Sequence, residues 1–425
     1  MLDIKEIRNN PKEVKQRLQT RGEEFQVDRL VILDEKRREI ISEVEQLKHL
    51  KNEVSRKIPV MKKEGKNIKP IIEEMRGVGD KIKVMDDSLK DIENEIEEIL
   101  LITPNIPDKD VPVGKDESEN VEVYRWGTPK DFKFIPKAHW DIGPDLNILD
   151  FATAAKITGA RFTMFRGHGA RMVRALAAFM IDLHVQKHGY SEVLPPYLVN
   201  TDSMIGTGQL PKFAEDAFKV EDEDYYLIPT AEVPVTNIYR DDILTEDEFP
   251  IKYCAYSACF RAEAGAAGRD TRGLIRQHQF DKVEMINFVK QEDSPKALDN
   301  MVDAAKHVLE KLELPYRIIE MCTGDLGISA AKKYDLEVWM PSYNDYVEIS
   351  SCSNCRVYQA RRANIRYRNE ESGNLDFVHT LNGSGLAIGR CIAALLENHQ
   401  QEDGSVKIPK ALSKYMGGTE KICVR

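Results

Sequence analysis

Several common signatures are missing from this 425-residue sequence. No apolar run approaches the roughly 18 residues that a membrane-spanning helix needs, and the charged start, MLDIKEIRNN, has no apolar signal core. We therefore expect neither a membrane protein nor an exported one. Seven cysteines, an odd number, do not make a disulfide framework in a chain of this length, and they fit a reducing cytoplasm.

The usual nucleotide- and metal-binding motifs are missing too. No G-x-x-x-x-G-K-[ST] or H-E-x-x-H occurs, and Gly383, Gly385 and Gly389 miss the dinucleotide-binding spacing by one residue. Cys352 and Cys355, in CSNC, have the spacing of zinc ligands, but no second Cys or His pair lies near them in the sequence. We favour a structural role for this pair and expect no zinc.

The N-terminal region has a helical pattern. Positions at alternating steps of four and three are apolar from Leu33 to Met61, except for Arg37 and Lys51, and again from Ile71 to Ile99. Such steps average 3.5 residues, the coiled-coil period. The segment KEGKNIKP (63–70) separates the two runs with a glycine and an asparagine, and its proline suits a helix start. We predict an antiparallel helical hairpin, an arm of roughly 45–50 Å.

The predicted tip of this arm is basic. Between residues 48 and 69 there are eight Lys or Arg and two acids, in a chain of net charge −10. One interpretation is a solvated coiled-coil surface, and the other is a lever that presents cations to a phosphate backbone. The candidate nucleic-acid-binding residues are Lys48, Lys51, Arg56, Lys57, Lys62 and Lys63.

A proline-rich, charged segment (104–120) reads as a linker, and the pattern changes after it. Residues 170–190 predict a long helix, 192–199 look strand-like, and 385–400 predict a final helix. Closely spaced strand candidates lie at 224–229, 251–260, 280–289, 335–341 and 345–352, which favours an antiparallel sheet. We predict an α+β fold: a helical domain (1–103), the linker (104–120), and an antiparallel sheet flanked by helices (121–425).

The stretch FRAEAGAAGRDTRGLIRQHQF (260–280) holds four arginines and no lysine. Arginine's planar fork can hold phosphate oxygens bidentately, and Gly265, Gly268 and Gly273 would let a loop between two strands close over a polyphosphate. Phe280 could stack on a base and Glu263 could accept from its amine. The alternative is a surface hairpin rich in weak salt bridges, and the pattern alone does not decide between them.

Five ordered blocks carry a family resemblance. FRAE and RQHQFDKVE resemble the second signature motif of class II aminoacyl-tRNA synthetases; GYSEVLPPYLV, with Pro196, resembles the first, and LNGSGLAIGR, ending at Arg390, the third. TAEVP (230–234) and EISSCSNC (348–355) are similar to two further blocks of seryl-tRNA synthetases. Together with the arm, the resemblance to bacterial-type members of that family covers nearly the whole chain.

The resemblance implies an ATP site with magnesium. Arg261 would contact the α-phosphate, Arg276 and Arg390 the β- and γ-phosphates, while Phe280 and Glu263 would contact adenine. Magnesium, a hard cation, would be bound by Glu348 with help from Ser351. The resemblance also places Ala262, Ile349 and Ser350 in the ATP site. It assigns a catalytic role to Arg261 and Arg390.

The resemblance also implies a serine site. Glu232, with Thr230 and Ala231, would bind the amino end, and Glu284 with Ser384 the hydroxyl end. Taken alone, Glu232 and Glu284 read as ordinary ion-pair or strand-end acids. Arg269 and Arg272 are left as loop residues near the tRNA acceptor end.

The implied partners are L-serine, tRNA(Ser) and, where present, tRNA(Sec). The resemblance also implies a homodimer formed through the helix before Pro196. We expect the protein to be cytoplasmic and not associated with a membrane. Two alternatives are a relative that loads an activated amino acid onto a carrier protein and a non-catalytic coiled-coil interaction protein. The complete basic arm argues against the first. Intact Arg261, Glu263, Glu348, Ser384 and Arg390 argue against the second.

Overall fold

The computed structural model describes residues 1–264 and 272–423, and the chain divides into two compact units. The helical unit comprises residues 2–19 and 23–104. The sheet unit comprises Met1, residues 20–22 and residues 105–425. Among the described residues, no helix is both long and apolar enough to cross a membrane.

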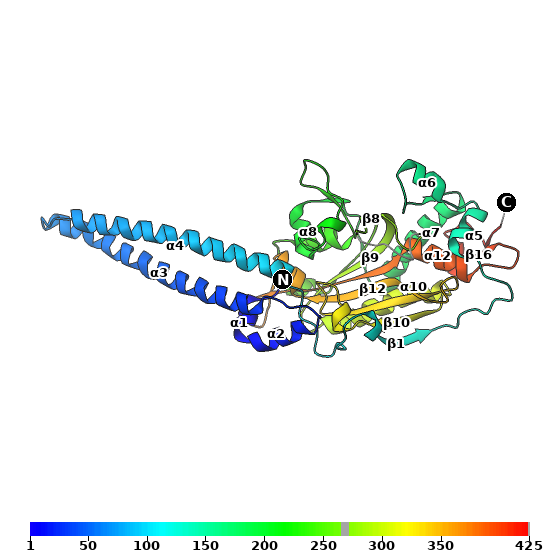
Figure 1. Cartoon of the computed structure of the whole chain (residues 1–425), viewed down its shortest axis with the longest axis horizontal. Helices are drawn as coiled ribbons and strands as arrows, with labels where there is room; N and C mark the ends of the chain where they lie inside the picture. Colours follow the sequence, from blue (N-terminus) through cyan, green and yellow to red (C-terminus); the bar gives the residue numbers. More distant parts are fainter. Residues whose placement is uncertain (265–271, 424–425) are drawn as a thin grey trace. The chain divides into compact units, whose positions relative to one another are not determined.

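The helical unit is built from four helices (Figure 1): α1 (Ile4–Asn9), α2 (Pro11–Gln19), α3 (Val27–Lys63) and α4 (Lys69–Ile102). Ion pairs join α3 to α4 in reverse order, with Arg37 bound to Glu93 at 2.9 Å and Lys48 to Asp86 at 3.4 Å. Gly65, at φ +74°, occupies the left-handed region between the helices. The predicted antiparallel hairpin is therefore confirmed.

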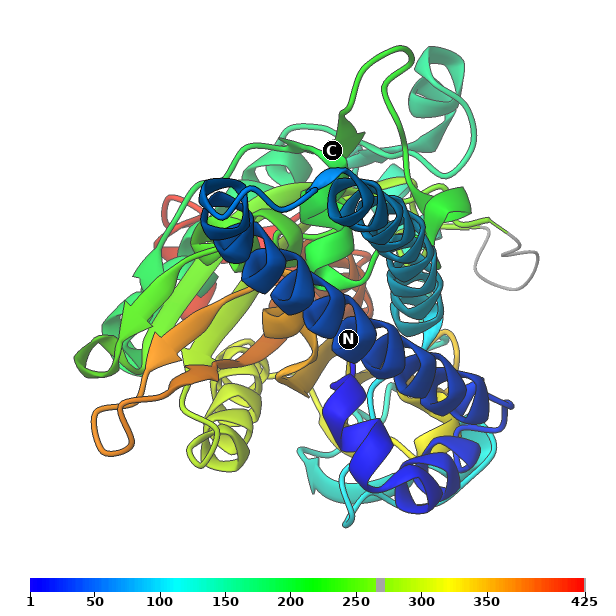
Figure 2. The ribbon, with the colours of Figure 1, turned by 90° about the vertical axis from the view of Figure 1, so that its left-hand side faces the viewer.

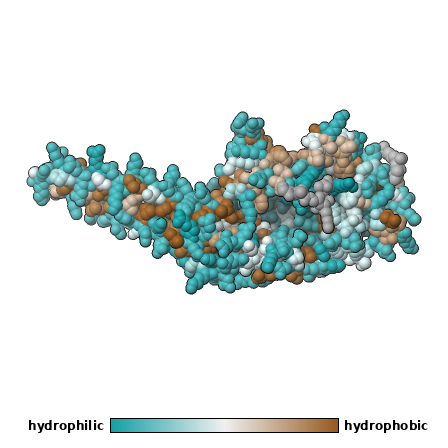
Figure 3. All heavy atoms as spheres, in the orientation of Figure 1, coloured by the Kyte–Doolittle hydropathy of each residue, from teal (hydrophilic) through white to brown (hydrophobic). Residues whose placement is uncertain are grey.

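The hairpin buries its seam and exposes the rest. Leu33 and Val44 on α3 and Met75 and Ile82 on α4, all members of the 3.5-residue pattern, are buried. The remaining surface of the two helices is mostly hydrophilic with scattered apolar patches (Figure 3). The periodicity therefore marks the contact between the helices.

The sheet unit contains an eight-stranded sheet in the order β1-β10-β11-β12-β15-β9-β8-β4. Its pairings are antiparallel except for β4 with β8, which confirms the predicted antiparallel sheet. In Figure 2 the green strands of residues 251–289 lie beside the orange strand of residues 379–387. The strands of the unit are β1 (Val121–Trp126), β2 (Leu149–Asp150), β3 (Met164–Phe165), β4 (Ser191–Glu192), β5 (Leu198–Val199), β6 (Tyr226–Leu227), β7 (Ile243–Thr245), β8 (Ile251–Phe260), β9 (Gln279–Val289), β10 (Tyr316–Glu320), β11 (Lys332–Met340), β12 (Asp345–Arg356), β13 (Arg366–Arg368), β14 (Leu375–Phe377), β15 (His379–Ala387), β16 (Val406–Lys407) and β17 (Lys421–Ile422).

Two predicted elements differ from the structure. The strand-like segment 192–199 is split into β4 and β5, which belong to different sheets. Pro195 and Pro196 lie between them, and proline has no N–H to donate to a strand ladder. The final helix begins at Ile388 rather than at residue 385, because residues 379–387 pair with β9 and β12 as β15.

Helices cover one face of this sheet. Helix α7 contacts β8 and β9, α10 contacts β12 and β15, and α12 contacts β9 and β11. The helices of the unit are α5 (His139–Asp145), α6 (Phe151–Ile157), α7 (His168–His188), α8 (Thr201–Thr207), α9 (Glu232–Thr236), α10 (Ser294–Lys311), α11 (Tyr358–Arg362), α12 (Ile388–Asn398) and α13 (Lys410–Ser413). Helix α7 ends at His188 and is capped by Gly189, which has φ +69°.

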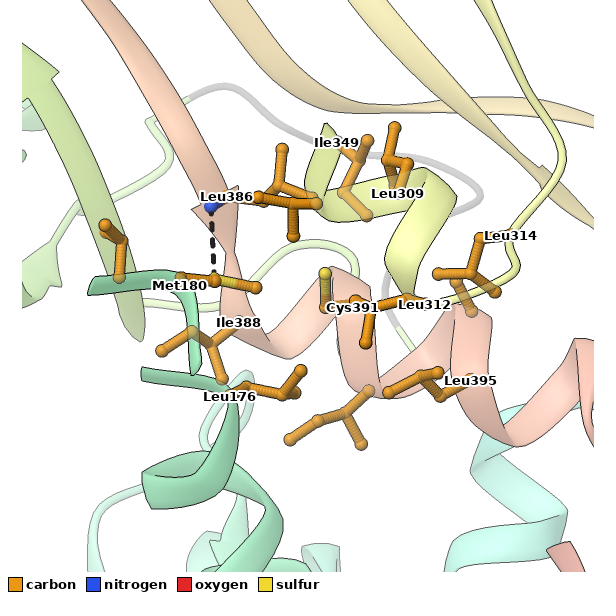
Figure 4. Close-up of a cluster of buried hydrophobic side chains, with 14 of the residues drawn as sticks. Leu176, Met180, Leu309, Leu312, Leu314, Ile349, Leu386, Ile388, Cys391 and Leu395 are labelled. Atoms are coloured by element: carbon orange, nitrogen blue, oxygen red, sulfur yellow. Dashed lines mark hydrogen bonds between the residues drawn. The ribbon is translucent and has the colours of Figure 1, made fainter. Parts of the chain in front are cut away.

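Side-chain alternation along β9 separates two cores. Val283, Met285 and Val289 join the large core beneath α7, α10 and α12, of which Figure 4 shows Leu176, Met180, Leu386, Ile388, Cys391 and Leu395 packed together. Ile286 and Phe288 point to the opposite face and pack in a second cluster with residues of α9 and α11. Even-numbered β9 residues therefore share a face that these long helices leave uncovered.

Candidate active site

A cavity of about 330 Å³ lies on this second face of the sheet. Its lining combines strand residues with residues that follow β8 and α8 and residues from the starts of α9 and α12. The lining residues are Gln209, Thr230, Glu232, Arg261, Glu263, Leu274, Ile275, Gln277, Phe280, Lys282, Glu284, Lys333, Glu348, Ile349, Ser351, Asn382, Ser384, Ala387, Gly389 and Arg390. Residues from nearly 200 positions of sequence thus converge on one site.

Strand geometry explains which side chains line the cavity. Phe280, Lys282 and Glu284 are two residues apart on β9, so they share a face. Ser384 on β15 is the direct ladder partner of Glu284. This register therefore brings together the two residues that the sequence assigned to one end of a serine molecule.

A bulge on β12 brings together two further site residues. Glu348 and Ser351 are three positions apart and would face opposite sides of a regular strand. The register shifts here, because Leu336 pairs with Ser350 whereas Glu337 pairs with Glu348, leaving Ile349 as an extra residue. Both side chains consequently line the cavity.

One end of the cavity holds compensated buried charges. Glu284 is 2% exposed and forms an ion pair with Lys282. Thr230 Oγ1 accepts a hydrogen bond from Lys282 Nζ at 2.9 Å and donates one to Glu284 Oε2 at 3.3 Å. The cation, the carboxylate and the hydroxyl form one connected group.

Glu232 lies close to this group at the start of α9. Its Oε1 accepts from Gln359 Nε2 at 2.5 Å and from Asn382 Nδ2 at 3.0 Å. Burial, followed by repulsion from Glu284, raises the pKa of Glu232 to about 7. The cavity therefore contains a carboxyl group poised to become charged when a cation binds beside it.

The other end of the cavity is rich in arginine. Arg261 follows β8, donates from Nε to the carbonyl of Pro229 at 3.3 Å, and places its guanidinium 5.2 Å from the centre of the Phe280 ring. Glu263, at φ +50°, pairs with Arg276 at 3.3 Å. Four of the residues assigned to ATP thus form two pairs, Arg261 with Phe280 and Arg276 with Glu263.

Arg390, on α12, closes this end of the cavity. It binds the Glu348 carboxylate at 3.2 Å and backbone carbonyl at 2.6 Å, and its Nε donates to the carbonyl of Ile275 at 3.3 Å. Burial alone would raise the pKa of Glu348, but Arg390 and Lys333 more than offset it and hold the pKa below its usual value. Glu348 is therefore a carboxylate at neutral pH.

The oxygen donors fit a hard cation. Glu348 offers a carboxylate and Ser351 a hydroxyl, the ligand types that Mg²⁺ prefers. Beside Ser351, the buried Asp335 has one carboxylate oxygen, Oδ1, with no hydrogen-bond partner. Among residues 1–264 and 272–423, no group of three or more His, Cys, Asp or Glu side chains has the arrangement of a metal site, so any Mg²⁺ here needs further oxygens from substrate or water.

Most of the residues predicted for the ATP and serine sites line the cavity, and the four exceptions are Ala231, Ala262, Arg276 and Ser350. Arg276 contacts the wall of the cavity through its ion pair with Glu263. Ala231 and Ser350 are buried and do not line it, and Ser350 Oγ donates to the carbonyl of Ser384 at 2.6 Å. Ala262 is also outside the lining and binds the carbonyl of Asp216 through its backbone N–H at 2.9 Å. Gly265, Gly268 and Arg269 lie outside the described residues.

Sequence reasoning missed the supporting polar residues. Lys282 lies two positions before Glu284, and that spacing on a predicted strand was a signal that both would share a face. Gln359 and Asn382 carried no comparable signal, because their contact with Glu232 joins segments 127 and 150 residues apart.

Cys352 and Cys355 are buried free thiols on β12.

The six cations assigned to nucleic-acid binding all belong to the helical unit. Lys48, Lys51, Arg56, Lys57, Lys62 and Lys63 lie on α3 and are exposed. Lys48 is engaged by Asp86.

Comparison with known proteins agrees with this architecture. Residues 218–399 match the family model of the tRNA synthetase class II core domain (G, H, P, S and T), and residues 1–107 match that of the seryl-tRNA synthetase N-terminal domain. The fold and its cavity thus define a class II aminoacyl-tRNA synthetase.

Similar proteins of known family specify which class II synthetase family the chain belongs to. The chain is 60% identical to the serine–tRNA ligase of Carboxydothermus hydrogenoformans, over 98% of both proteins, and 60% identical to that of Listeria monocytogenes, over 99% of both. The crystal structure of seryl-tRNA synthetase from Pyrococcus horikoshii complexed with ATP superposes with a TM-score of 0.95 at 38% identity, with 100% of each chain covered. The chain belongs to the seryl-tRNA synthetase family.

The buried ion pair of Lys282 and Glu284 predicts that removing the lysine alone destabilises the protein more than removing both charges. Lys282→Met would leave Glu284 charged and unpaired at 2% exposure, and we expect a loss of about 3–5 kcal/mol in the free energy of unfolding. In the double variant Lys282→Met/Glu284→Gln the orphaned charge is gone, so part of this stability should return. Urea unfolding measures both, and a Lys282→Met protein as stable as the unaltered chain would contradict the pairing.

Proposed function

We propose that this protein activates L-serine with ATP to form seryl-adenylate and then transfers the seryl group to the terminal ribose of tRNA(Ser), and of tRNA(Sec) where that tRNA exists. The observation that carries the proposal is one cavity that holds two buried carboxyl groups, Glu232 and Glu284, together with Arg261 and Arg390. Arg276 pairs with Glu263, which also lines this cavity. A small cationic, hydroxyl-bearing substrate and a polyphosphate are the chemical classes that this combination accepts.

The arginine-rich end is the proposed ATP site. Arg261 neutralises charge at the α-phosphate, while Arg276 and Arg390 hold the β- and γ-phosphates through their planar forks. Phe280 offers a flat face for adenine, and Glu263 accepts from the exocyclic amine. These side chains also pair with one another, as Glu263 does with Arg276 and Glu348 with Arg390, so ATP must replace these contacts when it binds.

Mg²⁺ is proposed at Glu348 and Ser351. The low pKa of Glu348 and the β12 bulge that aligns it with Ser351 support this assignment. When bound, the ion would add positive charge beside the phosphates. The arginines of this chain would neutralise the remaining phosphate charge and orient the phosphates.

The charged pocket near α9 is the proposed serine site. The substrate ammonium lies beside Glu232 and Thr230, and its hydroxyl is read by Glu284 and Ser384. An amino acid without a hydroxyl, such as alanine, would leave the buried Glu284 without that partner. Sites of this kind discriminate by about 10⁴-fold or more.

The chemistry needs positioning and charge neutralisation. A carboxylate oxygen of serine attacks the α-phosphorus, the bond to the bridging oxygen breaks, and pyrophosphate leaves with that electron pair. A ribose hydroxyl of tRNA then attacks the seryl carbonyl, losing its proton, and AMP leaves. Arg261 lies where negative charge builds during the first step.

The arm is proposed to bind tRNA by shape and backbone charge rather than by base sequence. The six exposed cations on α3 support this role. We further propose a cytoplasmic homodimer in which α7, the helix before Pro196, forms the interface, so that the arm of one subunit serves the active site of the other.

Removal of the α-phosphate ligand tests the activation step. Arg261→Ala should lower serine-dependent exchange of pyrophosphate into ATP by about 10²–10³-fold, as loss of a transition-state charge contact does. Arg368→Ala, an exposed arginine on β13 outside the cavity, is the matched control and should retain activity. Equal activity of the two variants would refute the assigned role of Arg261.

The raised pKa of Glu232 predicts a pH dependence of serine affinity. Below pH 7 the carboxyl group is protonated in the empty cavity, so binding the serine ammonium must first release that proton. We expect serine affinity, measured by calorimetry, to rise about tenfold from pH 6 to pH 8, since one unit below the pKa the charged fraction falls tenfold.

Glu232→Gln should bind serine weakly and without this pH dependence. If Glu232→Gln showed the same dependence of serine affinity on pH, a group other than Glu232 would be responsible for it.

The arm predicts separable half-reactions. Lys57→Gln/Lys62→Gln should leave pyrophosphate exchange unchanged and should weaken tRNA binding. The dependence of the tRNA binding constant on salt concentration should also fall, by an amount that corresponds to about two fewer released counterions. Lys36→Gln/Lys90→Gln removes two exposed charges from positions farther from the α3–α4 turn and should have little effect. Normal tRNA charging by the first variant at 150 mM salt would contradict a binding role for the tip.

A further inference from the structure

A fully buried histidine–carboxylate pair lies behind the ATP end of the cavity. His139, the first residue of α5, and Glu397, near the end of α12, are both 0% exposed, and His139 Nδ1 lies 2.6 Å from Glu397 Oε1. Glu397 also accepts from the backbone N–H of His139 at 3.0 Å and from the N–H and hydroxyl of Ser342, both at 2.8 Å. Four donors thus hold this carboxylate in one orientation.

The second ring nitrogen of His139 reaches the active-site backbone. The N–H of Leu274 donates to His139 Nε2 at 3.0 Å. A backbone N–H only donates, so Nε2 must be the unprotonated nitrogen, and the single proton of the neutral ring lies on Nδ1 and points to Glu397. The carboxylate therefore selects the tautomer that can accept from Leu274.

Leu274 and Ile275 form part of the cavity wall. The carbonyl of Ile275 accepts the Nε–H of Arg390, and Arg390 lies seven residues before Glu397 on the same face of α12. One helix thus carries a proposed phosphate-binding guanidinium and the carboxylate that orients His139. The guanidinium donates to the Ile275 carbonyl, and the carboxylate orients the imidazole that accepts from the N–H of the adjacent Leu274.

Gly273 shows how closely the imidazole approaches this segment. A Cβ at Gly273 would lie 2.1 Å from His139 Nε2, and its φ of +78° is in the left-handed region. Any larger residue must therefore push the ring away from Leu274.

We propose that His139 and Glu397 are positioning residues for ATP binding: the neutral imidazole, held in its Nδ1–H tautomer by Glu397, fixes the Leu274–Ile275 backbone against which Arg390 is ordered. This inference rests on the proposed ATP site. Neither residue lines the cavity, so their effect reaches the nucleotide through Leu274, Ile275 and Arg390.

Two substitutions of His139 separate its two hydrogen bonds. In His139→Asn the amide nitrogen reaches the place of Nδ1 and keeps the bond to Glu397, but nothing accepts from Leu274. In His139→Gln the longer side chain brings an oxygen to the place of Nε2 and keeps the acceptor. We expect His139→Asn to weaken ATP binding, measured by calorimetry without serine, about tenfold, and His139→Gln by about threefold or less.

The split between substrates distinguishes positioning from general damage. KM for serine at saturating ATP should stay within about twofold in both variants, because the serine end makes no contact with His139. Unchanged ATP affinity in His139→Asn, or equal losses for ATP and serine, would overturn the proposal. If the unaltered chain bound ATP but showed no serine-dependent exchange, the proposed function would fail, and the ATP affinities would still decide this inference.

A glycine pair provides an independent test should His139→Asn fail to fold. Gly273→Ala and Gly418→Ala carry similar backbone strain, at φ +78° and +80°, but a Cβ at Gly418 meets nothing within 4 Å. Gly273→Ala should weaken ATP binding about tenfold relative to Gly418→Ala. Equal ATP affinities in these two variants would contradict a role for the His139–Leu274 contact.

Discussion

The register of four neighbouring strands, β8, β9, β15 and β12, is the constraint on which the rest of the structure depends. Alternation on β9 puts Val283 and Met285 in the large core and Lys282 and Glu284 in the cavity. A slip of one residue would exchange these two sets, burying charges in the core and exposing the apolar side chains. The packing of α7, α10 and α12 on one face therefore determines which residues face the substrate on the other.

Charge compensation is the second constraint, and it follows from the first. A cavity wall at this depth tolerates carboxylates only if cations or amide donors face them. Lys282 faces Glu284, Gln359 and Asn382 face Glu232, and Arg390 faces Glu348. Each of these three carboxylates therefore has a cation or amide donor from the protein itself.

The sequence predicted what depends on local pattern. The 3.5-residue period identified the α3–α4 hairpin, and the closely spaced strand candidates identified the antiparallel sheet. Long-range contacts left no such pattern: the β12 bulge at Ile349, the pairing of Glu232 with Asn382 and the His139–Glu397 pair appear only once the strands and helices are assembled. Propensity also failed where tertiary pairing prevailed, as in residues 385–387, which read as helix and extend β15 instead.

We propose that this strand register builds one site that binds a hydroxyl-bearing amino acid beside ATP. The most direct measurement is pyrophosphate exchange into ATP by the unaltered protein, with serine, alanine and threonine supplied in turn. We expect exchange with serine, and a ratio of kcat/KM for serine over alanine of about 10⁴ or more, because alanine would leave Glu284 without its proposed hydroxyl partner. Comparable exchange with alanine, or exchange with another amino acid but not with serine, would contradict it.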